Sequence, residues 1–149
     1  MPPLHKDLNW EAPPPPSDAS DLPWVRLSVS NAHSTPMAHI IISRPVIESL
    51  GWEAGRDALA LRIGRDAENR VQALELRPHR EGEIGRPLRQ TRGAKGSGQF
   101  YCALPADMNR RLVSLELQHW KVDPKDDGTL ELDVSGIFYL SNHVQEPVA

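Results

Sequence analysis

Short segments with alternating apolar and polar residues dominate the chain from residue 24 onward. In the segment 24–30, Val25, Leu27 and Val29 fall on one face and Arg26 and Ser28 on the other, which predicts a half-buried β-strand. The continuous run of isoleucines at 40–42 predicts a strand covered on both faces. Similar patterns predict strands over 58–63, 71–76, 99–104, 114–122, 129–134 and 137–140.

Two short helices are predicted between these strands. Ser43 offers a hydroxyl cap, Pro45 fits a first helical turn, and Gly51 suits a helix C-terminus because glycine adopts the left-handed conformation readily. A second helix is predicted over 105–112, with Pro105 near its first turn. Each predicted helix stands between a strand and a pair of further strands.

The order strand, helix, strand, strand therefore occurs twice, which predicts an internal pseudo-repeat. We expect a mainly β fold with two short helices, forming a small closed or half-closed β-barrel from the two pseudo-equivalent halves. The predicted divisions are a flexible proline-rich arm (1–23), one domain (24–141) with a first half (24–80), a basic glycine-rich linker (81–98) and a second half (99–141), and a loose C-terminal end (142–149).

Composition fits one soluble domain. The chain has 149 residues, 39% of them apolar and 25% charged, which suffices for a single core. Cys102 is the single cysteine, so no internal disulfide can form, and a reducing, cytoplasmic setting is expected. No run approaches the roughly 20 apolar residues that cross a bilayer, so no membrane association is predicted. The net charge of −3 means that nucleic-acid binding would need local clusters of basic residues.

The segment Ile-Ser-Arg-Pro-Val-Ile-Glu-Ser-Leu-Gly-Trp-Glu-Ala-Gly-Arg-Asp-Ala-Leu-Ala-Leu, residues 42–61, resembles the AbrB/SpoVT-type transcription-factor family. In that family a strand leads into a short helix ending in Leu-Gly, and a glycine-containing turn leads into the next strand. The resemblance covers about residues 25–76, with a weaker second copy over 99–134. It implies a swapped-hairpin barrel that binds DNA, here completed within one chain as a pseudo-dimer.

The basic positions of the family are only partly present. The resemblance implies basic side chains on the first strand, just before the second strand and on the exposed helix face. Arg26 matches the first of these positions, whereas His39 stands at the second and Ile47 and Glu48 replace the basic helix residues. The resemblance thus supports the fold more strongly than DNA binding.

The most basic segment lies between the two halves. Residues 85–98 contain four basic and no acidic residues among several glycines, so the segment could follow a phosphate backbone or an acidic protein surface. The alternative is a solvated linker whose charge only maintains solubility. The candidate nucleic-acid contacts are Arg26, Arg86, Arg89, Arg92 and Lys95, extended by Arg110 and Arg111 on the second predicted helix.

Two tryptophans are candidates for contacting a partner. Trp10 lies in the predicted arm beside a proline run, where it could dock on another protein or fold back on its own domain. Trp52 directly follows the helix-ending glycine; packing in the core is the favoured interpretation, although it could also stack a base or anchor a partner. Trp120 has the same two alternatives.

No catalytic, metal or cofactor site is predicted. The six histidines lack the spacing of metal ligands. Ser43, Asp107 and His39 lack the motifs of a hydrolase, so capping and solvation explain Ser43 and Asp107 better. The acidic turn 123–128 lacks the distal glutamate of a calcium loop. The chain is therefore not expected to be an enzyme.

Two functions are compatible with these residues. The first is a non-enzymatic, sequence-tolerant regulator of the AbrB-like type that binds duplex nucleic acid through phosphate contacts. The alternative is a protein-binding module, such as an antitoxin-like partner or a phage or mobile-element protein that inhibits a host complex in the manner of an anti-CRISPR. The acidic net charge and the missing basic positions favour the alternative, and association into a homodimer is left open.

Overall fold

The protein consists mainly of β-strands arranged in two antiparallel sheets, which confirms the expected fold class. The computed structural model describes residues 9–12, 22–31, 35–91, 96–108, 112–125 and 128–138. The elements in chain order are β1 (Val25–Ser30), β2 (Met37–Ile42), α1 (Arg44–Leu50), β3 (Ala58–Arg65), β4 (Val71–Pro78), β5 (Arg86–Pro87), β6 (Arg89–Gln90), β7 (Gly98–Ala103), the 3₁₀ turn η2 (Ala106–Met108), β8 (Leu112–Glu116), β9 (Trp120–Asp123) and β10 (Thr129–Asp133).

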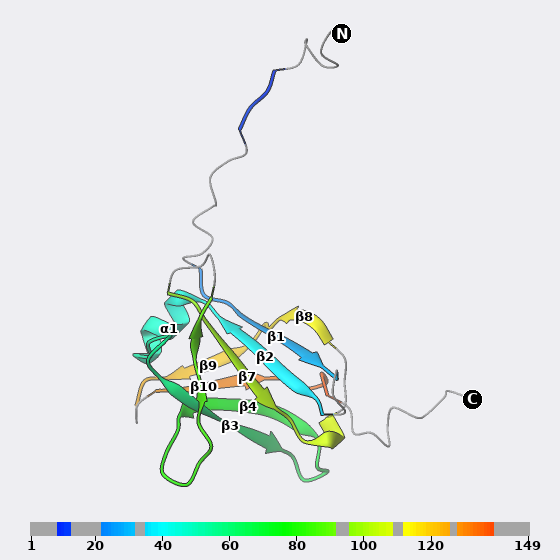
Figure 1. Ribbon diagram of the computed structural model, residues 1–149. Coiled ribbons are helices and arrows are strands. Elements are labelled where there is room, and N and C mark those ends of the chain that lie inside the picture. Colours follow the sequence, from blue (N-terminus) through cyan, green and yellow to red (C-terminus); the bar gives the residue numbers. More distant parts are fainter. Residues whose placement is uncertain are drawn as a thin grey trace, which may run out of the picture.

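Each sheet contains strands from both halves of the sequence. Sheet A has the order β6-β7-β2-β1-β8, and sheet B has the order β5-β3-β4-β10-β9 (Figure 1). At the centre of sheet A, β2 of the first half pairs with β7 of the second, and in sheet B, β4 pairs with β10. The two halves therefore form one structure and do not fold as separate neighbours.

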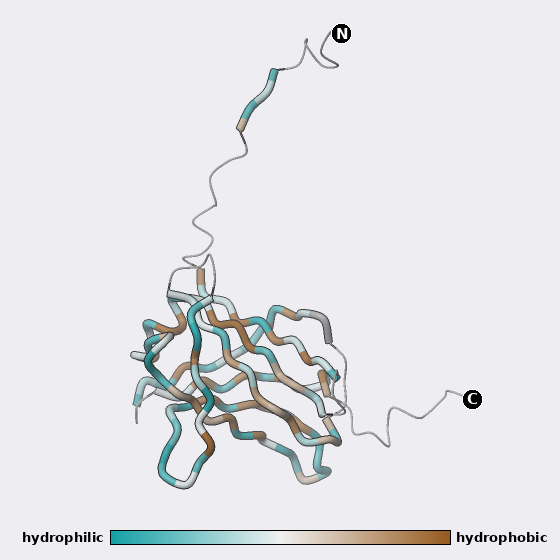
Figure 2. The backbone as a smooth tube through the Cα atoms, viewed as in Figure 1, coloured by the Kyte–Doolittle hydropathy of each residue, from teal (hydrophilic) through white to brown (hydrophobic). Residues whose placement is uncertain are grey.

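The core lies between the inner faces of the two sheets. Fully buried side chains include Leu27, Ile40 and Phe100 from sheet A and Leu74 and Leu132 from sheet B. Figure 2 shows the hydrophobic residues along the strands and a hydrophilic loop between β4 and β5. Because the core side chains come from both sheets and both halves, neither half could bury its apolar face alone.

Helix α1 begins and ends as predicted but is not capped by Ser43. Pro45 stands in the first turn, and Gly51 ends the helix with a φ of 75°. The buried Ser43 hydroxyl instead accepts a hydrogen bond of 2.9 Å from the backbone N–H of Trp24. The expected cap is therefore wrong, because the hydroxyl ties the start of β1 to the end of β2. The helix packs Val46, Ile47 and Leu50 at one end of the sheets (Figure 1).

Several other expectations differ from the structure. The second helix predicted over 105–112 is a single 3₁₀ turn, η2, within the described residues. The strand predicted over 114–122 is two strands in different sheets, β8 and β9, because the chain turns at residues 117–119. Residues 137–138 are not in a strand, and 139–140 lie outside the described residues.

The barrel is not closed. Within the described residues, no strand pairing connects sheet A to sheet B. At one side the chain crosses from sheet B to sheet A between β5 and β6, and at the other side it crosses back between β8 and β9. The sheets are therefore linked by chain crossings and a shared core, and the expected closure into a barrel is not confirmed.

The segment predicted as a linker contributes to both sheets. Between β5 and β6, the Leu88 side chain is fully buried, its N–H donates to the Asp57 carbonyl at 2.9 Å, and its own carbonyl accepts from Gly55 N–H at 2.7 Å. Gly98 is needed beside it, because a Cβ there would lie 2.7 Å from a Leu88 methyl. Arg86 on β5 and Arg89 on β6 lie on either side of Leu88. These contacts therefore hold both arginines where the chain passes from the edge of sheet B to the edge of sheet A.

Candidate nucleic-acid interface

The outward-facing side of sheet A brings together two of the arginines predicted from the sequence. Arg89, Gln99, Ile41 and Arg26 lie directly opposite one another on four adjacent strands, in the order β6-β7-β2-β1. Residues opposite one another in antiparallel strands project from the same face of the sheet. We call the outward side chains of these four strands the sheet A face.

The burial pattern of β2 explains why this face is open. Ile40 and Ile42 are fully buried, whereas Ile41 is only half-buried between them. The prediction that 40–42 is covered on both faces is therefore wrong. Only the inner face packs on sheet B, and outer side chains such as Tyr101 are partly exposed.

An aromatic pair occupies the next row of the sheet A face. His39 on β2 is opposite Tyr101 on β7, and their rings stack with centroids 4.0 Å apart and planes 10° apart. The His39 ring is also held by Gln99, whose Oε1 lies 3.2 Å from Nε2. Tyr101 is 46% exposed. One face of the Tyr101 ring is thus covered by His39. The pairing of β2 with β7 holds the two residues opposite one another.

Arg26 is held at the other side of this face. Its guanidinium carbon lies 4.5 Å from the centroid of the Trp24 ring, which gives a cation–π contact. Glu116 on β8 is its neighbour across the strands, but no ion pair joins them in the described structure. The Arg26 charge is therefore positioned by an aromatic ring and is available to an anion.

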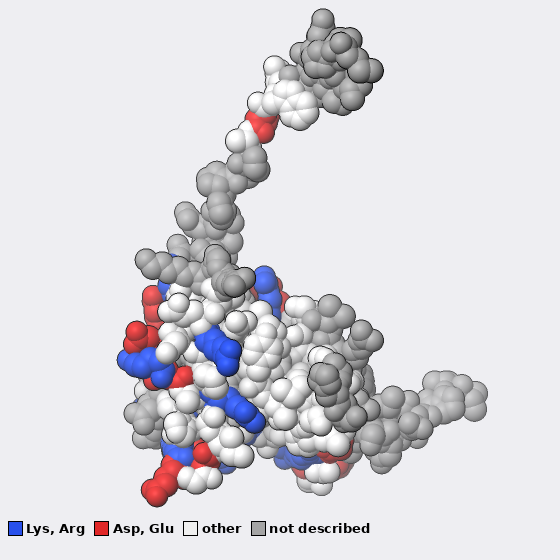
Figure 3. All heavy atoms as spheres, viewed as in Figure 1, with Lys and Arg blue, Asp and Glu red and all other residues white. Residues whose placement is uncertain are grey.

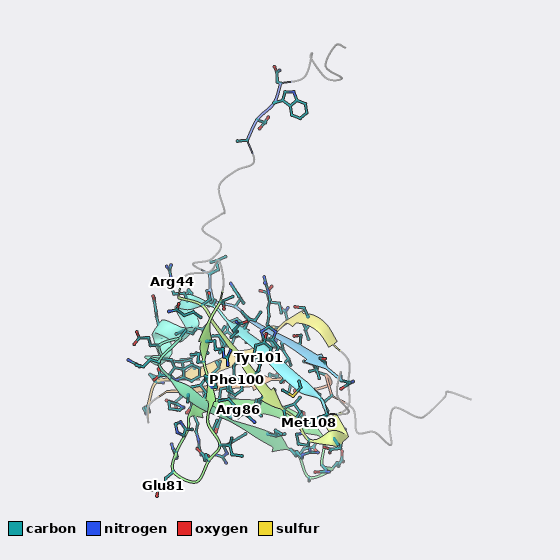
Figure 4. The ribbon with its side chains drawn as sticks, viewed as in Figure 1. Arg44, Glu81, Arg86, Phe100, Tyr101 and Met108 are labelled. Carbon is teal, nitrogen blue, oxygen red and sulfur yellow. The ribbon has the colours of Figure 1, made fainter. Side chains whose placement is uncertain are left out.

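A groove of about 330 Å³ lies beside Tyr101. Figure 4 labels Arg86 and Tyr101, which lie near one another in the view. Partial burial raises the pKa of the Cys102 thiol, so Cys102 is neutral in the groove. The groove is lined by Met37, Arg86, Pro87, Arg89, Tyr101 and Cys102. It combines an aromatic ring with two positive charges, and none of its described lining residues is a carboxylate.

The arginines that line the groove differ from those of β3, β4 and the neighbouring turns in their ion pairs. In β3, β4 and the turns beside them, three arginines are paired with acids: Arg62 with Glu75, Arg70 with Asp66 and Arg77 with Glu83. Within the described ranges, neither Arg86 nor Arg89 forms an ion pair with a carboxylate. Figure 3 shows basic atoms on the middle of the viewed face and a mixture of acidic and basic atoms toward its margins.

The remaining candidates are three tryptophans, which the structure describes, and four basic residues, which lie outside the described residues. Trp52 is 6% exposed and belongs to the core, as the favoured interpretation held, whereas Trp10 is 78% exposed. Trp120 packs partly against the core. Four candidates lie outside the described residues: Arg92, Lys95, Arg110 and Arg111.

The structure adds side chains that sequence reasoning missed. Tyr101, Gln99 and Met37 were not singled out, and His39 was considered only as a missing basic position and as a rejected hydrolase residue. The alternation around Phe100 carried the signal for Tyr101, because a buried Phe100 on a strand requires an outward neighbour. The convergence of Tyr101, Gln99 and His39 with Arg89 depends on long-range strand pairing, which local patterns do not reveal.

The residues considered for a hydrolase do not converge. The Ser43 hydroxyl accepts from the backbone of Trp24, and the His39 ring contacts Gln99. Asp107 forms a two-pronged ion pair with Arg65, at 2.6 and 3.0 Å, which holds the pKa of the Asp107 carboxyl below its usual range. Across the described positions, no cluster of three metal-ligating side chains occurs, and no helix is long and apolar enough to span a membrane.

Comparison with known proteins identifies no relative. No family model matches the chain, and neither the curated proteins nor the solved structures include a significant match. The functional argument therefore depends on the sheet A face itself.

Proposed function

We propose that the protein is a non-enzymatic nucleic-acid-binding regulator that contacts phosphates through the sheet A face. The observation that carries the proposal is the common location of Arg26 and Arg89, which stand in one row across four paired strands. Three strand spacings of about 4.8 Å place their backbones about 14 Å apart. Two guanidinium groups at this separation can contact different phosphates of one nucleic acid.

Arg86 extends the proposed contact. It lines the groove together with Arg89 and belongs to the same unpaired set of basic side chains. The net charge of −3 gives no general attraction to nucleic acid, so a local cluster must supply it. Such binding is sequence-tolerant, because phosphate contacts carry little information about bases.

The strand pairing supports the proposed AbrB-like pseudo-dimer. Pro105 follows Pro45 by 60 residues, and at this same spacing the two ladders place Ile40 opposite Phe100 and Ala73 opposite Asp133. An antiparallel pair of equivalent strands is what a two-fold axis generates, and a single spacing of 60 residues that fits both ladders is compatible with one unit repeated about one axis. The departure is the second helix, of which the described residues retain only η2.

The test is a fluorescence-anisotropy titration of a labelled mixed-sequence duplex at two salt concentrations. Each lost phosphate contact lowers the slope of log K against log salt by about one. We expect the double variant Arg26→Ala, Arg89→Ala to weaken binding and lower this slope by about two.

The matched control is Arg62→Ala, Arg70→Ala, which removes two exposed arginines that are ion-paired on sheet B. This control is expected to leave the salt slope unchanged. Absence of binding to any nucleic acid at low salt would overturn the proposal, as would equal loss in both double variants. A stoichiometric protein partner that survives nuclease treatment would instead support the alternative protein-binding function.

A further inference from the structure

We infer that the groove beside Tyr101 receives an unpaired base, so that the protein prefers single-stranded to duplex nucleic acid. This inference rests on the proposed function and specifies which form of nucleic acid the sheet A face binds. The groove volume of about 330 Å³ is at the lower end of the range for small-ligand sites, 300–1,000 Å³. A site of this size suits one nucleotide and not a large ligand.

The Tyr101 ring provides the stacking surface. Its partner His39 covers one side at a centroid distance of 4.0 Å, and the groove borders the tyrosine, which is 46% exposed. The ring is held by the β2–β7 pairing and by the His39 contact with Gln99, so little side-chain entropy is lost when a base binds. A base that stacks here would continue the existing stack of two rings.

The charges of the groove complement a nucleotide and not an apolar peptide. Arg86 and Arg89 line the same groove as the tyrosine, and the lining residues that the structure describes include no carboxylate. Arginine offers paired donors to phosphate oxygens and can also stack on a base. An aromatic ring with adjacent arginines is the combination by which single strands are bound without sequence preference.

A duplex cannot use this site in the same way. Its bases are paired and stacked, and one of them would reach the Tyr101 ring only by flipping out of the helix, at a cost of unpairing and unstacking. An unpaired strand presents its bases without that cost. The stacking contribution is therefore available to single strands alone, while the phosphate contacts are available to both forms.

The experiment compares the affinity for an oligothymidylate and for a duplex, each of about 12 nucleotides per strand, within the 4–16 that comparable modules cover. We expect the wild type to bind the single strand more tightly. Tyr101→Ala should weaken single-strand binding about tenfold and leave duplex binding nearly unchanged. Tyr101→Phe retains the ring and should bind as the wild type does.

Leu115→Ala is the matched control, because Leu115 is an exposed apolar residue on β8, at the far edge of sheet A from β6. It should leave both affinities unchanged, and circular dichroism checks that each variant is folded. Equal weakening of both forms by Tyr101→Ala, or no effect of it, would overturn the inference while the salt-dependent binding through Arg26 and Arg89 stands. Failure to bind either form would overturn the proposed function itself.

Discussion

Substitution of Gly128 by alanine tests the contact between the two halves of the chain. Gly128 precedes β10, has a φ of +85°, and packs against the end of α1. An added Cβ would lie 2.5 Å from the Leu50 carbonyl oxygen and 3.1 Å from the Trp52 indole nitrogen. Both neighbours belong to the first half of the chain, so the substitution probes packing between the halves.

Gly82 provides the matched control. It also has a φ of +85°, but a Cβ there would meet nothing within 4 Å. Alanine in the left-handed conformation costs about 1–2 kcal/mol, which both substitutions share. The contact with backbone at Gly128 adds an overpacking cost of about 1–3 kcal/mol. We expect Gly82→Ala to lose about 1–2 kcal/mol and Gly128→Ala about 2–5 kcal/mol.

Urea denaturation followed by circular dichroism measures both free energies of unfolding. The larger effect of Gly128→Ala should appear as a lower midpoint at an unchanged m-value. Equal losses for the two variants would refute the reasoning, because they would mean that Gly128 has the same open surroundings as Gly82. The turn before β10 would then not pack on Leu50 and Trp52.

Three further predictions concern the core, one ion pair and the thiol. Phe100→Ala should lower the free energy of unfolding by about 3–5 kcal/mol in thermal or urea denaturation, because its ring is fully buried between the sheets; a loss below 1 kcal/mol would contradict that placement. Asp107→Asn should cost about 1 kcal/mol at pH 7, because its partly exposed side chain pairs with Arg65. Because the pKa of Asp107 is lowered in the folded protein, the stability that its ion pair contributes is present above the unfolded pKa of about 3.9 and is lost as the pH falls through the folded pKa. The difference in urea midpoint between wild type and Asp107→Asn should therefore narrow between pH 7 and pH 3. A constant difference would contradict this prediction. Cys102 should react with iodoacetamide more slowly at pH 8 in the folded protein than in urea, because burial raises its pKa; equal rates would contradict this.

Local patterns predicted the strands well because one face of each strand packs on the core. In β1, Val25, Leu27 and Val29 are buried while Arg26 is exposed, as the alternation indicates. The break between β8 and β9 also left a signal. Apolar residues occupy odd positions from Val113 to Leu117 and even positions from Trp120, and such a change of phase marks a turn.

Other features depend on residues far apart in the sequence. The segment after Ser43 has the local pattern of a capped helix, but the hydroxyl is used by Trp24, 19 positions earlier. Likewise, the basic character of the segment 85–98 was evident, whereas its entry into both sheets depends on contacts of Leu88 with Gly55 and Asp57. The alignment of Arg89 with Arg26 follows from the register of four strands, which no local pattern encodes.

Mapping of backbone amide shifts by NMR during titration with an oligonucleotide tests the central claim most directly. We expect the largest changes in β6, β7, β2 and β1, centred on residues 89, 99–101, 39–41 and 26, with little change in β3, β4 and β10. Changes concentrated in β3, β4 and β10, or no changes at low salt, would contradict the assignment of nucleic-acid binding to the sheet A face.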